Sequence, residues 1–207
     1  MLLQQIIINY IMLRYKKPSF KNKKYLENFF IKKGLKFLVD ESKKVPPSVN
    51  QMKMIKPTMP ELDDLYSLYQ YVLINKRITI LEFGSGWSTL IFSLALRELK
   101  SKFSKEAKLL RRNNPFELFV IENSKKYLNI TRNRIQKVNK YLKIKDQIKI
   151  NFHLSNVEMT TFNDRICTQY KILPLCNPDF IYLDGPDQFN IKKHINGIST
   201  NHKDMMP

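Results

Sequence analysis

The sequence predicts an α/β fold in which a parallel sheet of about four strands is flanked by helices and preceded by a basic N-terminal extension. Three observations support this fold class. Short apolar runs alternate with helical patterns between residues 61 and 184. A turn with two glycines joins the first of these runs to the helix that follows it. Of the 207 residues, 43% are hydrophobic, which is enough to bury one core. Strands and helices that alternate in this way form parallel sheets with right-handed crossovers.

The extension, residues 1–60, is the most basic part of the chain. It holds 13 Lys and Arg residues against 3 acids, whereas the domain, residues 61–207, holds 23 against 15. The apolar run Met1–Leu13 is too short to span a bilayer and lacks the features of a signal peptide. Two interpretations of this run stay open: a helix that packs on its own domain or on a partner chain, as in a homo-oligomer, or a segment resting on an anionic membrane surface. Prolines between residues 45 and 60 predict an irregular linker.

The domain is expected to alternate helix and strand. Helix 61–77 begins with acids and ends with Lys76 and Arg77, as the helix dipole favours. The first strand is a short apolar run, and the helix 124–142 has apolar residues at helical spacing. The strands are 78–83, 117–122, 148–154 and 179–184, and the later helices are 88–99 and 124–142. The basic stretch 100–114 is expected to connect the second helix to the second strand.

The turn after the first strand is the strongest sign of a ligand site. Glu82 closes that strand, and Gly84-Ser85-Gly86 follows before the next helix. Glycine permits a positive φ and lets a ligand approach the backbone, and strand-to-helix turns at the carboxyl edge of a sheet are where such folds bind ligands. Glu122 and Asp184 close two further strands. Because these ends share one edge of a parallel sheet, the three acids are expected to lie close together.

Dinucleotide binding is the first alternative for this turn. Its fingerprint needs a third glycine, and Thr89 stands there instead. It also places an acid about 20 residues further on, whereas Glu122 follows Gly86 by 36 residues. Both departures argue against a nicotinamide dinucleotide.

The segment 61–190 resembles a class I S-adenosylmethionine-dependent methyltransferase, whose first strand ends in an acid followed by Gly-x-Gly, here Glu82 to Gly86. In that family a second-strand acid, matched by Glu122, binds the ribose hydroxyls, and a fourth-strand acid, matched by Asp184, lies near the methyl-transfer site. The resemblance implies a Rossmann-like sheet with S-adenosylmethionine as cofactor. The cofactor-binding residues that it implies are Glu82, Gly84, Ser85, Gly86, Ser88, Glu122, Asn123, Ser155 and Asn156. Asn156 departs from the Asp that many members carry at that position.

Methyl transfer is an in-line displacement that depends mainly on alignment of the reacting atoms. A hydroxyl acceptor would also need a general base. The candidates by position are Asp184, Asp187 and His194. Asp184 could instead hold a divalent metal, but one Asp is too few to predict a metal site. Fold analogy favours O-methylation of a small molecule or a sugar.

The formal net charge of +18 favours a second class of partner, nucleic acid, so the alternatives are a nucleic-acid-binding module or an RNA methyltransferase. The 28 lysines outnumber the 8 arginines, however, as the codon bias of an AT-rich genome would produce, and base contacts favour Arg. Nucleic acid is therefore not the favoured partner. Cys167 and Cys176 are expected to be reduced thiols in a cytoplasmic protein.

The sheet is expected to be incomplete at its C-terminal side. Members of the family have seven strands, but only 23 residues follow Asp184, and they show no further buried-strand pattern. This leaves the fourth strand as an apolar edge. It also keeps open a third alternative, a truncated remnant without catalytic activity.

Overall fold

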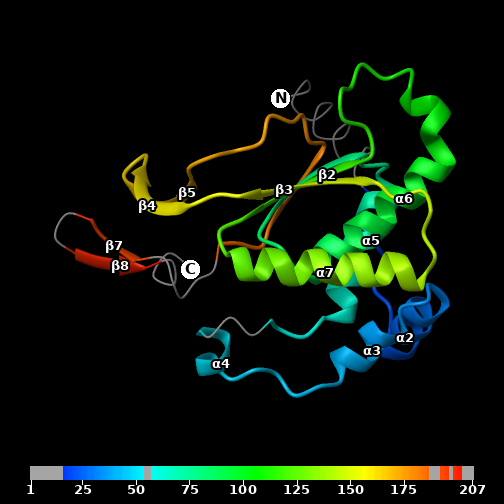
Figure 1. Ribbon diagram of the computed structural model, residues 1–207, viewed down its shortest axis with the longest axis horizontal. Helices are drawn as coiled ribbons and strands as arrows, with labels where there is room; N and C mark the ends of the chain where they lie inside the picture. Colours follow the sequence, from blue (N-terminus) through cyan, green and yellow to red (C-terminus); the bar gives the residue numbers. More distant parts are fainter. Residues whose placement is uncertain (1–15, 54–56, 187–191, 196–197, 202–207) are drawn as a thin grey trace, which may run out of the picture.

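The computed structural model describes residues 16–53, 57–186, 192–195 and 198–201, the last two segments as backbone only (Figure 1). The apolar run Met1–Leu13 and Asp187 lie outside the described residues, and so does the side chain of His194. Within the described ranges, none of the helices has both the length and the apolar composition that crossing a lipid bilayer requires.

The centre of the fold is a four-stranded parallel sheet with the strand order β3-β2-β1-β6. Its strands are β1 (Thr79–Phe83), β2 (Glu117–Glu122), β3 (Lys149–Leu154) and β6 (Phe180–Leu183). Ile80 of β1 pairs with Leu118 of β2 on one side and with Phe180 of β6 on the other. The prediction of an α/β fold with about four parallel strands is therefore confirmed.

Three helices cover one face of this sheet: α5 (Leu62–Ile74), α6 (Trp87–Ala107) and α7 (Lys125–Tyr141). Side chains alternate between the two faces of a strand, so Ile80 and Leu118 pack in one hydrophobic cluster with these helices. Leu81 and Ile121 point the other way and pack against Tyr170, in a segment without helices. The helical layer is thus one-sided, and in β6 Ile181 and Leu183 are 56% and 72% exposed at the edge of the described sheet.

The basic extension contributes to the same core. It forms α2 (Lys23–Lys32), α3 (Lys36–Ser42) and the short α4 (Val49–Lys53). Leu26, Phe30 and Leu38 are buried in the cluster that α5 and α6 share. The ring of Phe29 meets the ring of Tyr66 edge-on, with 5.0 Å between centroids.

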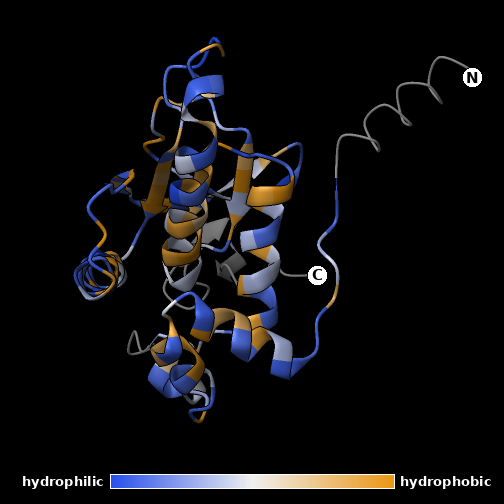
Figure 2. Cartoon of the chain, turned by 90° about the vertical axis from the view of Figure 1, so that its right-hand side faces the viewer, coloured by the Kyte–Doolittle hydropathy of each residue, from blue (hydrophilic) through white to orange (hydrophobic). Residues whose placement is uncertain are grey.

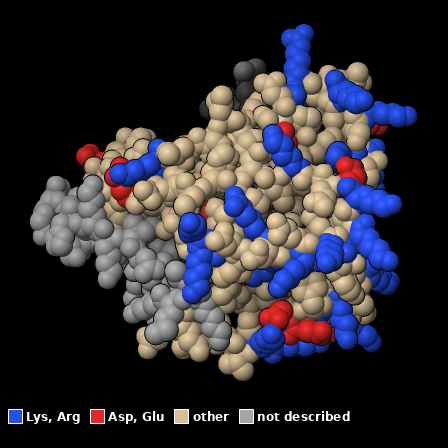
Figure 3. Space-filling model, in the orientation of Figure 1, with Lys and Arg blue, Asp and Glu red and all other residues tan. Residues whose placement is uncertain are grey.

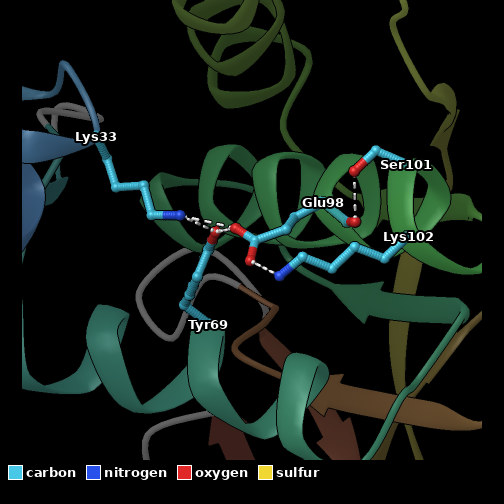
Figure 4. Close-up of polar contacts among 5 residues, drawn as sticks. All are labelled: Lys33, Tyr69, Glu98, Ser101 and Lys102. Carbon is cyan, nitrogen blue, oxygen red and sulfur yellow. Dashed lines mark hydrogen bonds and ion pairs between the residues drawn. The ribbon is translucent and has the colours of Figure 1, made fainter.

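A partly buried polar contact also ties the extension to the domain (Figure 4). The Glu98 carboxylate of α6 accepts hydrogen bonds from the Tyr69 hydroxyl of α5 and from Lys33 at the end of α2, the latter at 2.7 Å. Lys102, one turn further along α6, donates to its other oxygen at 2.7 Å. Burial alone would raise the pKa of Glu98, but these three donors outweigh it and lower the pKa to about 2.

The helix after the glycine turn is longer than predicted. α6 continues through residues 100–107, with a local break at Phe103, so the first half of the predicted connection 100–114 is helical. The first half of α6 is hydrophobic and buried, whereas the last turns of α6 are hydrophilic (Figure 2). Ion pairs hold these last turns: Lys100 lies 2.6 Å from Asp146, and Lys102 lies 2.7 Å from Glu98. The Lys100–Asp146 pair is tertiary, whereas Lys102 and Glu98 pair within α6 itself.

Two antiparallel hairpins were not predicted. β4 (Val157–Phe162) pairs with β5 (Arg165–Tyr170), and β7 (Lys192–Ile195) pairs with β8 (Ile198–Asn201). Both lie at the left of Figure 1, away from α2 and α3. The turn between β4 and β5 is Asn163-Asp164, each with positive φ, which is the conformation that closes a two-residue hairpin.

Candidate ligand site at the carboxyl edge of the sheet

The glycine turn brings the ends of β1, β2 and β6 together. Gly84 has a φ of +96°, and its N–H donates a hydrogen bond of 2.7 Å to the Ile121 carbonyl. A Cβ atom at Gly84 would lie 2.6 Å from the Asp184 carbonyl oxygen. Both the backbone conformation and the close approach therefore require glycine at position 84.

A cavity of about 630 Å³ lies at this turn, and we call it the edge cavity. Its walls come from the turn, the start of α6, the end of β2, the first half of α7 and residues 182–186. The extension closes one side through Met52 and residues 57–60. Among the residues predicted from the sequence, those that line it are Gly84, Ser85, Gly86, Ser88, Glu122 and Asp184.

Glu122 is held in place by both neighbouring turns. Its side chain is buried, with the residue 4% exposed. One carboxylate oxygen accepts a hydrogen bond from the Ser85 hydroxyl, and the other accepts one from the Ser124 N–H, each at 2.8 Å. An ionised carboxylate accepts hydrogen bonds only and can accept several donors at once.

Glu82 lies beneath the cavity wall and is fully buried. Its Oε1 accepts a hydrogen bond of 2.5 Å from the Ser88 hydroxyl, while its Oε2 has no hydrogen-bond partner among the described residues. Burial raises the pKa of Glu82 to about 8, even though hydrogen bonds from Ser88 and Thr89 lower it, and the nearby charges of Asp184 and Glu122 raise it further. Glu82 is therefore mostly protonated at neutral pH.

Three more acids stand on the β6 side of the edge cavity. Glu61 and Asp64, at the start of α5, line it together with Asp184. Burial raises the pKa of Asp184, and the negative charges of Asp64 and Glu61 raise it further. Burial and the charges of Asp64 and Asp63 likewise raise the pKa of Glu61. This part of a strongly basic chain is therefore locally negative, which favours a cationic ligand.

Among the residues that the structure describes, Arg134 is the cation that lines the cavity. The Arg134 guanidinium of α7 lies over the ring of Trp87, 3.6 Å from its centroid, and burial lowers the pKa of Arg134 to about 10. The Trp87 indole N–H donates a hydrogen bond of 3.1 Å to the Thr58 carbonyl. Trp87 thus joins the extension, α6 and α7 at the wall of the cavity.

Three predicted residues have other positions. Asn123, Ser155 and Asn156 do not line the edge cavity. Ser155 is buried, and its hydroxyl accepts a hydrogen bond of 3.0 Å from the Ile172 N–H. The Asn156 carbonyl accepts one of 2.9 Å from the Lys171 N–H. Ser155 and Asn156 thus anchor the chain after β5.

Sequence reasoning missed Glu61, Asp64, Trp87, Tyr182 and Arg134 as cavity residues. The acids before α5 are well explained by the helix dipole alone. Only the folded chain brings the start of α5 opposite the end of β6.

Searches against protein-family models, curated proteins and solved structures find no match for this chain. Among the residues that the structure describes, no group of three or more His, Cys, Asp or Glu side chains is arranged to hold a metal ion.

Proposed function

We propose that this chain is an S-adenosylmethionine-dependent methyltransferase whose edge cavity binds the cofactor. The observation that carries the proposal is the Glu122 carboxylate, fixed by Ser85 and Ser124 beside the glycine turn. A buried carboxylate at the end of the second strand is suited to accept hydrogen bonds from the two ribose hydroxyls of a nucleoside.

The charges in the cavity favour this cofactor over a dinucleotide. S-adenosylmethionine carries a sulfonium and an ammonium group and no phosphate, and Glu61, Asp64 and Asp184 line the cavity. A pyrophosphate would place two negative charges beside these acids, where phosphate sites usually offer amides and cations.

The chemistry supplied by the bound cofactor would be a methyl group on a positively charged sulfur. The chain would hold the ribose through Glu122 and surround the positive charge with acids. Asp184 lines the cavity, and its raised pKa makes it a stronger base than an ordinary Asp. It is our candidate to take the proton of a hydroxyl acceptor, such as that of a small molecule or a sugar.

Calorimetry with S-adenosylmethionine, S-adenosylhomocysteine and NAD⁺ tests the proposal. We expect saturable binding of the first two and none of NAD⁺. The absence of binding by a folded full-length chain, or preferential binding of NAD⁺, would contradict it.

We also propose a cytoplasmic location. Cys167 of β5 and Cys176 are both free thiols, and free thiols persist in a reducing compartment. Reaction of both with a thiol reagent in protein freshly isolated from cells tests this proposal.

A further inference from the structure

A second cavity lies on the helical side of the sheet, away from the glycine turn. It has a volume of about 450 Å³ and lies between α6, α7 and the edge strand β3. We call it the helix groove. It shares no lining residue with the edge cavity, although α7 contributes to both. The polar and aromatic side chains that line it include Arg97, Arg132, Gln136, Asn139, Gln147 and Phe152.

The helix groove combines a flat stacking surface with hydrogen-bonding groups. The Arg132 guanidinium lies over the Phe152 ring, 4.9 Å from its centroid, and Arg132 is exposed. Nucleobases stack on guanidinium planes and on aromatic rings. The amides of Asn139 and Gln147 are joined by a hydrogen bond of 3.1 Å, and such groups can bind the polar edge of a base.

Arg97 adds a cation that lacks a full set of partners. Its side chain lines the helix groove, and its buried Nε has no hydrogen-bond acceptor among the described residues. An unsatisfied buried donor is costly. The Arg97 side chain nevertheless lines the groove, where an anionic ligand would gain a charge-assisted hydrogen bond from its guanidinium.

The surface around the helix groove is strongly basic. Residues 125–149 contain nine Lys and Arg residues and one acid, Asp146, which pairs with Lys100 at 2.6 Å. Figure 3 shows Lys and Arg side chains over the face that α7 occupies. Basic side chains around an apolar and aromatic pocket are the arrangement with which proteins bind single strands, since cations follow the phosphates and flat side chains stack the bases.

We propose that the helix groove binds one nucleotide of a single-stranded nucleic acid, with its base stacked on Arg132 and the neighbouring phosphates on Arg97 and the lysines of α7. This site does not depend on the proposed cofactor, because the two cavities share no residue. The two cavities also differ in charge, since the edge cavity is lined by acids whereas basic residues surround the helix groove.

Fluorescence anisotropy with fluorescein-labelled decaadenylate RNA tests the proposal, at about 50 mM and about 200 mM salt because phosphate contacts weaken with salt. The competitors are inorganic decapolyphosphate, which has the charge without bases, and adenosine monophosphate. We expect the RNA to bind at least about tenfold more tightly than either. Equal competition by the polyphosphate would overturn base stacking, and tighter binding of the mononucleotide would overturn the nucleic-acid assignment.

The variants are matched in charge. Arg97→Gln with Arg132→Gln should weaken RNA binding about tenfold or more, since both the stacking surface and a phosphate contact are lost. The control, Lys24→Gln with Lys36→Gln, removes two charges from exposed positions on α2 and α3 and should weaken it less than threefold. Arg132→Lys keeps the charge but not the plane, so it should lose several-fold in affinity without loss of folding by circular dichroism. Equal effects of the two double variants, or full affinity of Arg132→Lys, would overturn the proposal.

Discussion

The backbone of Asp184 lies directly against the α-carbon of Gly84. A Cβ atom at Gly84 would lie 2.6 Å from the Asp184 carbonyl oxygen, and one at Gly185 would lie 2.9 Å from the Gly84 α-carbon. The Asp184 N–H also donates a hydrogen bond of 2.8 Å to the Phe83 carbonyl. The turn after β1 and the end of β6 thus form one close-packed backbone unit at the wall of the edge cavity.

Gly84→Ala is expected to destabilise the fold. The new methyl group would meet backbone rather than a movable side chain, and φ of +96° is unfavourable for alanine. We expect a loss of about 2 kcal/mol or more, which corresponds to a fall in Tm of about 4–8 °C in a chain of this size. Thermal unfolding followed by circular dichroism measures it.

Gly86→Ala is the matched control within the same turn. Gly86 has a φ of −174°, and a Cβ atom there meets nothing within 4 Å. Its Tm should stay within about 2 °C of the wild-type value. Similar losses in the two variants would contradict the close approach at Gly84.

Glu122→Ala should weaken binding of S-adenosylmethionine by about ten- to a few hundred-fold, because two charge-assisted hydrogen bonds to the ribose are lost. It should also reduce the free energy of unfolding by about 1–3 kcal/mol, since the Ser85 hydroxyl and the Ser124 N–H lose their acceptor. Glu122→Gln should fall between the wild type and Ala in affinity. Calorimetric titration and urea unfolding measure the two effects separately.

Two controls separate the ribose contact from general damage to β2. Ser85→Ala removes one internal hydrogen bond and keeps the carboxylate, so affinity should fall less than tenfold. Glu117→Gln changes an acid at the opposite end of β2, where it pairs with Lys149, and should leave affinity within about twofold. An unchanged affinity of Glu122→Ala for S-adenosylmethionine would contradict the proposed cofactor.

Glu82 should make the fold less stable as the pH rises. Its folded pKa of about 8 lies above the ordinary value of 4.5, so between these pH values the unfolded chain releases a proton that the folded chain retains. Stability is therefore greatest below pH 4.5 as far as this group is concerned, and it falls by about 3–5 kcal/mol as the pH approaches 8. Above that pH the contribution is constant.

Glu82→Gln replaces the protonated acid with a neutral group of similar shape. It should remove this part of the pH dependence and make the variant more stable than the wild type near pH 8. Urea unfolding at several pH values gives the comparison. Parallel stability curves for the two proteins would show that Glu82 is ionised in the folded chain.

Glu98 should make the fold less stable as the pH falls, the opposite of the effect of Glu82. Its folded pKa of about 2 lies below the ordinary 4.5, so its stabilising effect is full above pH 4.5 and is lost as the pH falls towards 2. Glu98→Gln should lower the free energy of unfolding by about 1–2 kcal/mol at pH 7, a value that allows for screening by solvent. The difference from wild type should shrink below pH 4.5 in urea unfolding experiments. Glu106→Gln, at an exposed position on the same helix, should have little effect at any pH.

β1, β2 and β6 could be predicted because each is a largely continuous apolar run, and β3 because its apolar residues alternate with polar ones. β2 has the bounds that the run ELFVIE predicts, and it is buried along nearly its whole length. β4 and β5 are half-exposed and mix polar with apolar residues, so they have no such run. The Asn163-Asp164 pair was the available signal for their hairpin.

In the edge cavity too, some residues could be predicted from the local sequence and others could not. Gly84 and Glu122 could be identified because a glycine turn and a strand end mark them locally. Arg134 could not, because its position on α7 gives no sign that it lies over Trp87. The core role of α2 was hidden for a similar reason: Leu26 and Phe30 stand one turn apart among lysines, and only packing against α5 shows that this narrow stripe is buried.

Trp87 gives the edge cavity a built-in optical reporter. It is the single tryptophan of the sequence, whereas the ten tyrosines absorb little at the red edge of the protein spectrum. Its indole ring lines the cavity in contact with the Arg134 guanidinium. Any ligand that displaces this guanidinium or excludes water from the ring changes the emission of one known residue. Occupancy of the cavity can therefore be followed by intrinsic fluorescence in the unlabelled protein, with no signal from the helix groove to subtract.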